Sequence, residues 1–296
     1  MGKGTILLRD IMGAKAYYSA RDRAFSAVSV FKNDGYPYKI IKQNRDLKNS
    51  HVGERCFILG NGPSLKRIDL KALSDEFVFT CNYFNLVEGY QDAKTNFHLW
   101  MDLNLFDMRP EVKSDPEMVK KCFSDISKEA PMCFIPAVAY PFVKKQELDK
   151  LLNIRYIHPK RPIRNSKIYD IDLTKSVYSC ATVVQYAVQI AIYMGFSKIY
   201  LMGCDSTNII THLNAILGQQ CEGLHAYSSD KENTEKAVKE LMNTWKTNRF
   251  LYDHYILFRG YELLNEYCDK KGIKLLNCSD PTLITEIERI SFDDVI

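Results

Sequence analysis

Residues 55–64 read RCFILGNGPS, and this stretch decides the fold that the sequence predicts. The apolar run CFIL is typical of a buried strand, and it ends at Gly60 before the turn NGPSL. Glycines allow a close approach of the backbone, and Pro63 with Ser64 can begin a helix whose free N–H groups attract an anion. The loop lacks the third glycine of the dinucleotide fingerprint and the GK[ST] of a P-loop. It is therefore either a phosphate-binding turn or an ordinary strand-to-helix connection.

Further apolar runs follow and alternate with helical patterns. The predicted strands are 56–60, 77–82, 96–102, 132–138, 197–205 and 272–279, and the predicted helices are 117–129, 144–152, 181–194 and 260–271. This alternation predicts an α/β, Rossmann-like parallel sheet with helices on both faces. Ligands of such sheets bind beyond the carboxyl ends of the strands. Because Asn61, Asn82, Asp102 and Asp205 follow predicted strands, we expect them along one rim.

Composition excludes several classes of protein. The 296 residues are 46% apolar and 26% charged, which rules out a collagen, a low-complexity chain and a mainly disordered protein. Nine Cys, an odd number without CxxC spacing, predict reduced thiols and a cytoplasmic location. No N-terminal signal peptide is visible. The uncharged run 176–197 is long enough to span a bilayer, but its polar residues favour a buried helix that leads into a central strand.

Basic residues concentrate in the first 50 positions, which hold ten Lys+Arg and four Asp+Glu, whereas the whole chain has 40 and 36. We therefore divide the chain into a basic helical N-terminal arm, 1–50, and a catalytic domain, 51–296. The arm is either a solvated helix pair packed on the main domain or a peripheral contact with the inner face of a membrane. Its aromatic residues also suit a homo-oligomer interface. No groove-binding motif suggests a nucleic acid partner.

Four segments carry a resemblance to a known family. CFILGNGPSLKRIDLKAL, WMDLNLF, TVVQYAVQIAIYMGFSKIYLMGCD and GIKLLNCSDPTLITEIE resemble the family 42 bacterial sialyltransferases, discontinuously over about 54–290. They are also similar to the motility accessory factor and 6-hydroxymethylpterin diphosphokinase-like proteins. The resemblance implies a modified GT-A-type, Rossmann-like glycosyltransferase that is inverting and metal-independent. It would move a sialic acid or related nonulosonic acid from a CMP-activated donor to a surface-glycan or lipid-linked acceptor in polysaccharide biosynthesis, without a cofactor.

The resemblance also implies which residues bind the donor. They are Gly60, Asn61, Gly62, Ser64, Asn82, Asp102, Thr182 and Asp205. Asn61 and Gly62 would meet the donor phosphate, and Thr182 lies in the helix start that holds the cytidine. Asp102 stands where the family usually has Asn, and Val183–Val184 replaces a Ser–Gly pair beside the cytidine.

Glycosyl transfer to a hydroxyl needs a base, and His is suited to this role because its pKa lies near the working pH. Two of the six His, His225 and His254, lie after Asp205 in a predicted lid at about 206–258. The sialyltransferase pattern favours His254 and the second group favours His225, so that both remain candidates. The candidates for stabilising the leaving group are Tyr227, Tyr252 and Tyr255.

Two other functions stay open. A diphosphokinase-like pyrophosphoryl transfer would need Mg²⁺ and clustered carboxylates, which Asp102, Asp205 and Asp170 would supply. A non-catalytic, degenerate member would keep the fold and bind another enzyme through the arm. The sequence DID at 170–172 is either a metal-binding DxD or a helix cap. No Cys/His spacing indicates a zinc site.

Overall fold

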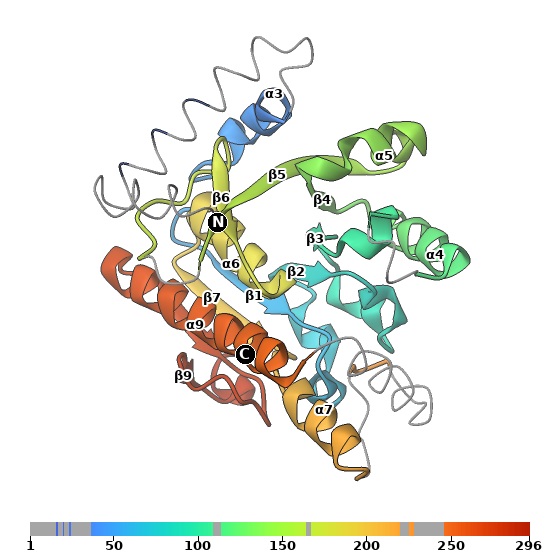
Figure 1. Cartoon of the computed structure of the whole chain (residues 1–296). Coiled ribbons are helices and arrows are strands. Elements are labelled where there is room, and N and C mark those ends of the chain that lie inside the picture. The colour runs from blue at the N-terminus through green and yellow to red at the C-terminus, as the bar shows by residue number, and fades with distance from the viewer. Residues whose placement is uncertain are drawn as a thin grey trace.

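The computed structural model describes residues 37–108, 114–163, 167–219, 225–227 and 246–296, together with Ala16, Ala20 and Ala24. Within these residues, a sheet of nine strands has the order β6-β5-β4-β3-β2-β1-β7-β8-β9 (Figure 1), and every neighbouring pair is parallel. The strands are β1 (Arg55–Leu59), β2 (Phe77–Cys81), β3 (Phe97–Leu99), β4 (Met132–Pro136), β5 (Asn153–Pro162), β6 (Ser176–Ser179), β7 (Lys198–Met202), β8 (Lys274–Asn277) and β9 (Glu288–Arg289). The predicted α/β, Rossmann-like class is confirmed.

Helices cover both faces of the sheet. They are α3 (Tyr38–Ile41), α4 (Pro116–Ser127), α5 (Tyr140–Lys145), α6 (Val183–Met194), α7 (Asn208–Ile216) and α9 (Thr247–Lys271). The 3₁₀ segments are η1 (Lys42–Leu47), η2 (Pro63–Arg67), η3 (Leu70–Leu73), η4 (Phe84–Leu86), η5 (Tyr90–Ala93), η6 (Leu103–Phe106), η7 (Ala137–Ala139), η8 (Leu148–Lys150) and η9 (Phe292–Asp294). Helices α6 and α9 pack together on one side of the sheet, whereas α4 and α5 lie on the other (Figure 1).

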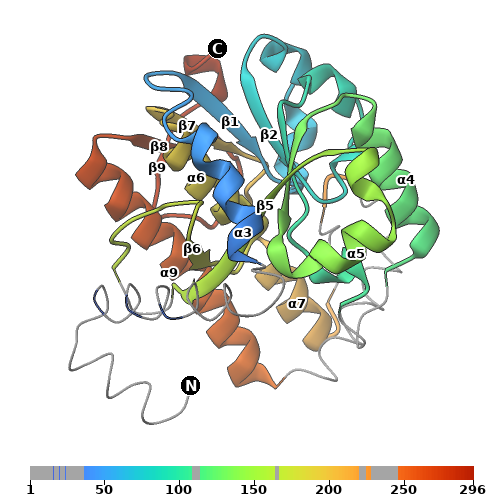
Figure 2. The ribbon, with the colours of Figure 1, turned by 90° about the horizontal axis from the view of Figure 1, so that it is seen from above.

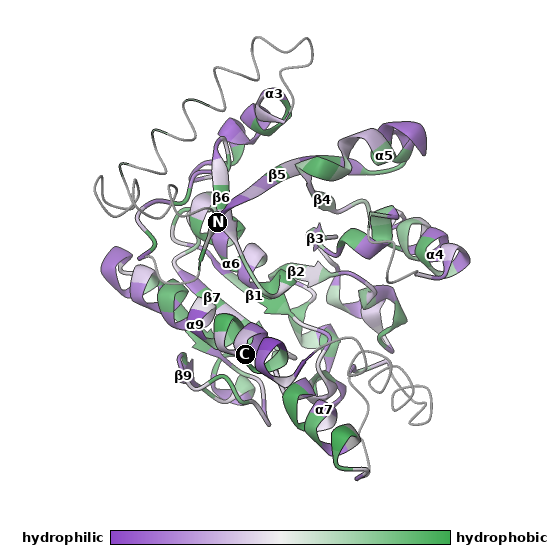
Figure 3. Cartoon of the chain, viewed as in Figure 1, coloured by the Kyte–Doolittle hydropathy of each residue, from purple (hydrophilic) through white to green (hydrophobic). Residues whose placement is uncertain are grey.

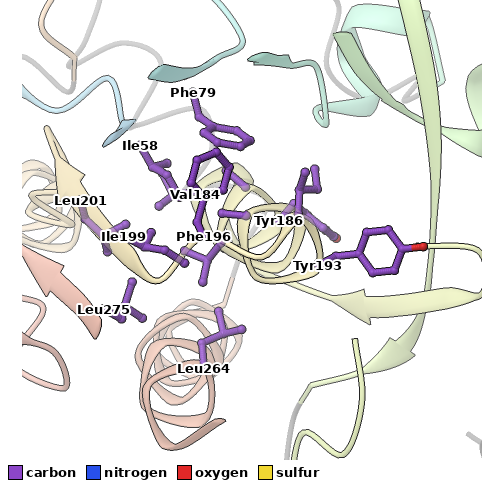
Figure 4. Close-up of a cluster of buried hydrophobic side chains, with 14 of the residues drawn as sticks. Ile58, Phe79, Val184, Tyr186, Tyr193, Phe196, Ile199, Leu201, Leu264 and Leu275 are labelled. Atoms are coloured by element: carbon purple, nitrogen blue, oxygen red, sulfur yellow. The ribbon is translucent and has the colours of Figure 1, made fainter. Parts of the chain in front are cut away.

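Alternation along the strands assigns each side chain to a face. Ile58 of β1 and Leu201 of β7 point to the α6 side, where they join a buried cluster with Val184 (Figure 4). The preceding residues, Phe57 and Tyr200, point to the opposite face, and their rings stack with centroids 5.0 Å apart. A strand that is apolar on both faces is typical of a parallel sheet covered by helices. Burial of both faces therefore explains the continuous apolar runs in the sequence.

Three strands, β5, β6 and the two-residue β9, were not predicted from the sequence. Strand β5 contains Pro159 and Pro162, and proline normally argues against a strand because it cannot donate to the ladder. The structure accommodates this sequence at a shift of register between Pro159 and Arg161, where β5 pairs with β6. Strand β6 is the first part of the uncharged run 176–197, in which we predicted only the helix 181–194; the observed helix α6 is Val183–Met194.

Other boundaries also differ from the prediction. The helical stretch expected after NGPSL consists of the two 3₁₀ segments η2 and η3. Helix α9 begins at Thr247, 13 positions before the predicted start at Gly260. No described helix is both long and apolar enough to cross a bilayer. Much of α7 is hydrophobic (Figure 3), although it is too short for such a role.

The described end of the N-terminal arm packs on the main domain. Helix α3 lies against β5 (Figure 2), and the Asn44 side chain donates to the carbonyls of Tyr156 and Leu173 at 2.7 and 3.1 Å. Arg155 of β5 pairs with Asp46 through two contacts of 3.0 and 2.8 Å. Most of the arm, and the predicted lid at 220–224 and 228–245, fall outside the described residues, so that the division into arm, domain and lid stays a prediction.

Candidate active site at the carboxyl ends of the strands

A cavity of about 720 Å³ lies at the carboxyl ends of the parallel strands. Its walls come from the segments that follow β1, β2, β3, β4, β6 and β7, with further contributions from β5 and α9. This volume is within the range of about 300–1,000 Å³ that small-molecule sites occupy. The predicted donor residues that line it are Gly60, Asn61, Gly62, Asn82, Asp102, Thr182 and Asp205. The structure therefore brings these residues together, while their roles stay predictions.

The amides of the GNGPS loop are already engaged within the protein. The N–H of Gly62 donates to the carbonyl of Gly203 at 2.8 Å, and the N–H of Ser64 donates to Asp205 Oδ2 at 2.8 Å. The Ser64 hydroxyl forms a second, short hydrogen bond to Asp205 Oδ1. These amides were the groups expected to face a phosphate. In this structure they join the segment after β1 to the segment after β7.

The glycines of this loop are required by close packing. A Cβ atom at Gly60 would lie 2.4 Å from the carbonyl oxygen of Gly203. A Cβ atom at Gly62 would lie 2.6 Å from that oxygen and 2.6 Å from Asp205 Cγ. Any side chain at either position would push the two segments apart. The glycine pattern that suggested phosphate binding thus has a structural cause within the protein.

Asp205 is only 3% exposed and acts as an acceptor for this contact. Burial raises the pKa of its carboxyl above the ordinary value, and the two hydrogen bonds from Ser64 lower the pKa in part. Its backbone carbonyl also accepts from the N–H of Leu283 at 2.8 Å. Asp205 therefore holds the rim of the cavity together, and both of its carboxylate oxygens are occupied.

Two asparagines present defined groups at the ends of β1 and β2. Asn61 Nδ2 donates to the carbonyl of Cys81 at 3.1 Å, and no partner for its buried Oδ1 exists among the described residues. Asn82 Oδ1 accepts from the N–H of Met101 at 3.4 Å. Because Oδ1 of Asn82 is engaged, Nδ2 is the group that this side chain can offer to a ligand.

The N-terminus of α6 opens on the cavity. Thr182 is the residue before the helix, and its side chain makes no capping hydrogen bond. Val183 and Val184 line the cavity with it. The first N–H groups of a 12-residue helix carry the positive end of its dipole, so that they favour an anion. Among the described parts of the cavity, this end of α6 is better suited to a phosphate or carboxylate than the GNGPS loop.

His225 lines the cavity, and the residue as a whole is exposed. The N–H of its neighbour Ala226 donates to the carbonyl of Asn61 at 2.7 Å. Loss of water around the ring lowers the pKa of His225, and a hydrogen bond with the Asn61 backbone raises it in part. A lowered pKa keeps the imidazole neutral, and a neutral imidazole can accept a proton.

His254 lies away from the cavity lining. It is 8% exposed on α9, and its Nδ1 donates to the carbonyl of Phe250 at 2.9 Å. Its ring centroid is 6.1 Å from that of His212 on α7. These contacts are those of a packed histidine between two helices. The structure thus separates the two candidate bases, and only His225 faces the cavity.

The three candidate tyrosines are also outside the cavity lining. Tyr227 stacks on His225 with ring centroids 5.0 Å apart and packs at the edge of the cluster that holds Phe57. Burial raises the pKa of Tyr227 far above its ordinary value, so that the phenol stays protonated. Tyr252 and Tyr255 are exposed on α9. Their role in stabilising a leaving group therefore stays a prediction.

Of the three carboxylates proposed for a diphosphokinase, Asp102 and Asp205 line the cavity, whereas Asp170 does not. Asp170 pairs with Arg161 at 2.7 Å, outside the cavity lining. Asp172 accepts from the N–H and the hydroxyl of Thr174 at 2.9 and 2.6 Å, in a turn before β6. This turn corrects our expectation of a helix cap at DID. In the described part of the chain, no group of three potential ligands could hold a metal ion.

Several lining residues were missed by the sequence analysis. They are Ser179, Cys180, Tyr186, Ser206, Thr207, Asn208 and Tyr261. Ser179 ends β6, Cys180 follows it and Tyr186 lies on α6; we did not predict β6 because its apolar run merges with that of α6. Tyr261 is 1% exposed and reaches the cavity from α9, far along the chain. The signal available was the polar stretch STN after Asp205, which follows a correctly predicted strand.

Comparisons with known proteins complete this description. No protein-family model and no curated protein matches the chain. Among solved structures, the chain is similar to the sialyltransferase CstII from Campylobacter jejuni in complex with the substrate analogue cytidine-5'-monophosphate, with 17% identity, 81% of this chain and 86% of that chain covered, and a TM-score of 0.43. It is also similar to CstII in complex with CMP-3FNeuAc, with 16% identity, coverage of 80% and 86%, and a TM-score of 0.42.

Proposed function

We propose that this chain is a glycosyltransferase that moves a sugar from a nucleotide-activated donor to a hydroxyl group of a glycan acceptor. The observation that carries the proposal is the cavity, where an amide, a helix N-terminus and a neutral imidazole face one space at the carboxyl ends of the strands. The donor class, a CMP-activated sialic acid or related nonulosonic acid, rests on the sequence resemblance of the GNGPSL and MGFSKIYLMGCD segments. Membrane contact through residues 1–50 and a cytoplasmic location remain predictions.

The donor would be held by neutral hydrogen-bond donors. None of the described lining residues is Lys or Arg, so that positive side chains from this part of the chain do not meet the donor's charge. The N–H groups at the start of α6 and the Nδ2 group of Asn82 are donors of this kind, and Ser206, Thr207 and Asn208 add further polar side chains to the lining. Such preorganised dipoles stabilise a leaving phosphate in a site that excludes water. The metal-independent reaction that the resemblance implies is compatible with this set of groups.

His225 would act as the base. The acceptor hydroxyl oxygen attacks the anomeric carbon of the donor sugar as its proton passes to the imidazole. The bond between the anomeric carbon and the phosphate oxygen breaks, and CMP leaves with the electron pair. One displacement inverts the configuration at the anomeric carbon. The hydrogen bond between His225 and the backbone of Asn61 would orient the ring for this step.

A donor panel tests the proposal. The purified chain is incubated with CMP-, UDP- and GDP-sugars, with and without EDTA, and nucleotide release is measured by chromatography. We expect slow release of CMP from a CMP-activated nonulosonic acid in the absence of acceptor, unaffected by EDTA. If no sugar nucleotide binds or turns over, the proposal fails, and release that EDTA abolishes would indicate a metal-dependent reaction instead.

A further inference from the structure

Asn82 has an unusual backbone conformation at the edge of the cavity. Its φ angle is +48°, in the left-handed region, which asparagine adopts more readily than most residues other than glycine but still infrequently. Such a conformation persists only where its surroundings hold it, and it is often found at functional sites. The N–H of Asn82 donates to the carbonyl of Leu99 at 2.8 Å. The carbonyl of Asn82, which belongs to the next peptide unit, has hydrogen-bond partners of its own.

The carbonyl of Asn82 is held by the buried ring of His98 on β3. His98 Nε2 lies 3.1 Å from this oxygen, and the thiol of Cys122 donates to the same oxygen at 3.3 Å. Because a carbonyl can only accept, the proton of the imidazole must be on Nε2. Nδ1 is then an acceptor, and the Thr80 hydroxyl lies 2.7 Å from it. The ring is fully buried and packs edge-on against Trp100, with centroids 4.4 Å apart.

His98 is therefore neutral and has a defined tautomer. Burial lowers the pKa of His98 to about 3, and the hydrogen bond to Asn82 raises it only in part. Both ring nitrogens have partners, and neither faces the cavity, whose lining includes Asn82 but not His98. A role in proton transfer is thus excluded by position. What remains is a role through Asn82.

We propose that His98 is a positioning residue: its Nε2–H group holds the carbonyl of Asn82, keeps the left-handed backbone in place and thereby directs the Asn82 amide into the cavity. The chain of contacts runs from the Thr80 hydroxyl through His98 to Asn82, across neighbouring strands β2 and β3. The role of His98 in holding the Asn82 backbone is independent of the proposed function, whereas its effect on CMP binding rests on that function.

Two matched variants separate the two ring nitrogens. His98→Gln can place an N–H donor near the position of Nε2, whereas His98→Asn reaches only the position of Nδ1. With CMP as the probe in calorimetry, we expect His98→Asn to weaken binding about 3–10-fold, the effect of one lost hydrogen bond, and His98→Gln to restore most of it. A loss of the same size in both variants would overturn the proposal, as would wild-type binding by His98→Asn.

A double-mutant cycle tests whether His98 acts through Asn82. If it does, His98→Asn has no further effect on CMP binding once Asn82→Ala is present. Additive losses would show a general structural role and would overturn the inference. Thr95→Val is the control, since this buried hydroxyl also contacts Thr80, at 3.3 Å, but makes no hydrogen bond to His98 or Asn82. Should His98→Asn not fold, His98→Leu takes its place in the cycle.

Crystal structures keep this test independent of the proposed function. In the His98→Asn or His98→Leu variant, Asn82 should leave the left-handed region or shift its carbonyl. An unchanged φ angle and an unchanged side-chain direction would overturn the inference whatever the ligand. If the wild-type chain and Asn82→Ala bind CMP equally, or not at all, the proposed donor site fails, while the crystal structures still decide the role of His98.

Discussion

Asp205 accepts two hydrogen bonds from Ser64, one from the backbone N–H at 2.8 Å and one from the hydroxyl. Ser64 follows β1 and Asp205 follows β7, and these two strands are neighbours in the sheet. From β1 the chain adds β2 to β6 on one side, and from β7 it adds β8 and β9 on the other. Ligands of open α/β sheets bind at such a switch point. Here side-chain and backbone contacts within the protein tie the two segments together. The rim of the cavity is thus preorganised.

Ser64→Ala tests the strength of this contact. The variant removes the hydroxyl donor and leaves one oxygen of a buried carboxylate without its partner, so that we expect a loss of about 1.5–3 kcal/mol in the free energy of unfolding. Denaturant unfolding followed by circular dichroism measures it. Ser127→Ala is a suitable control, because its hydroxyl bonds a carbonyl at an exposed position. Equal stability of Ser64→Ala and the wild-type chain would show that the contact is dispensable.

Gly60→Ala should destabilise the chain through a steric clash. The added methyl group would lie 2.4 Å from the carbonyl oxygen of Gly203, and this neighbour is backbone, which cannot rotate away. Overpacking of this kind costs about 1–3 kcal/mol. Thermal unfolding measures the loss, and CMP binding measured on the folded variant should weaken because the rim is displaced. A variant as stable as the wild-type chain would show that the two segments separate at little cost.

His225→Ala and His254→Ala should have opposite effects. Removal of a general base lowers the rate about 10²–10⁴-fold, so that His225→Ala should lose transfer activity and keep its thermal stability. His254→Ala should lower stability, because the buried ring packs on Phe250 with centroids 4.3 Å apart, and should leave the rate of the folded enzyme nearly unchanged. Initial rates and melting temperatures are measured on both variants. Activity lost only in His254→Ala would reverse our assignment of the base.

The pH dependence of stability should reveal His98. Burial lowers its pKa from 6.5 to about 3 in the folded chain, so that at intermediate pH the unfolded chain binds the extra proton. The contribution of neutral His98 to the free energy of unfolding is therefore complete above about pH 6.5 and is lost as the pH falls towards 3. The slope for one group is at most about 1.4 kcal/mol per pH unit.

Denaturant unfolding between pH 7 and 4 measures this slope, and His98→Gln should reduce it. Asp125 does not obscure the result in most of this window. Hydrogen bonds from Lys121 and Lys128 lower the pKa of Asp125 from 3.8 to about 2, so that its contribution is lost only below about pH 4. An identical slope in the wild-type chain and in His98→Gln would contradict a neutral, buried His98.

Much of the sheet was predictable because its signals are local. Strands β1, β2 and β7 are short apolar runs that end in Gly or a polar residue, and helix α6 is an uncharged stretch that ends at Gly195. Burial on both faces of a parallel strand leaves such runs directly in the sequence. The gathering of Asn61, Asn82 and Asp205 at one rim followed from the same pattern, since the carboxyl ends of parallel strands share an edge.

The amino-acid sequence alone thus determined the fold class and the edge at which the candidate site lies. Only the tertiary structure decided how the polar groups at that edge are used. Ser64 and Asp205 are 141 positions apart. No local sequence pattern reveals that the Asp205 carboxylate accepts hydrogen bonds from the N–H and the hydroxyl of Ser64. In the same way, the choice between His225 and His254 depends on which ring reaches the cavity. Contacts between distant segments arise from packing of the whole chain, and therefore local propensity could not supply them.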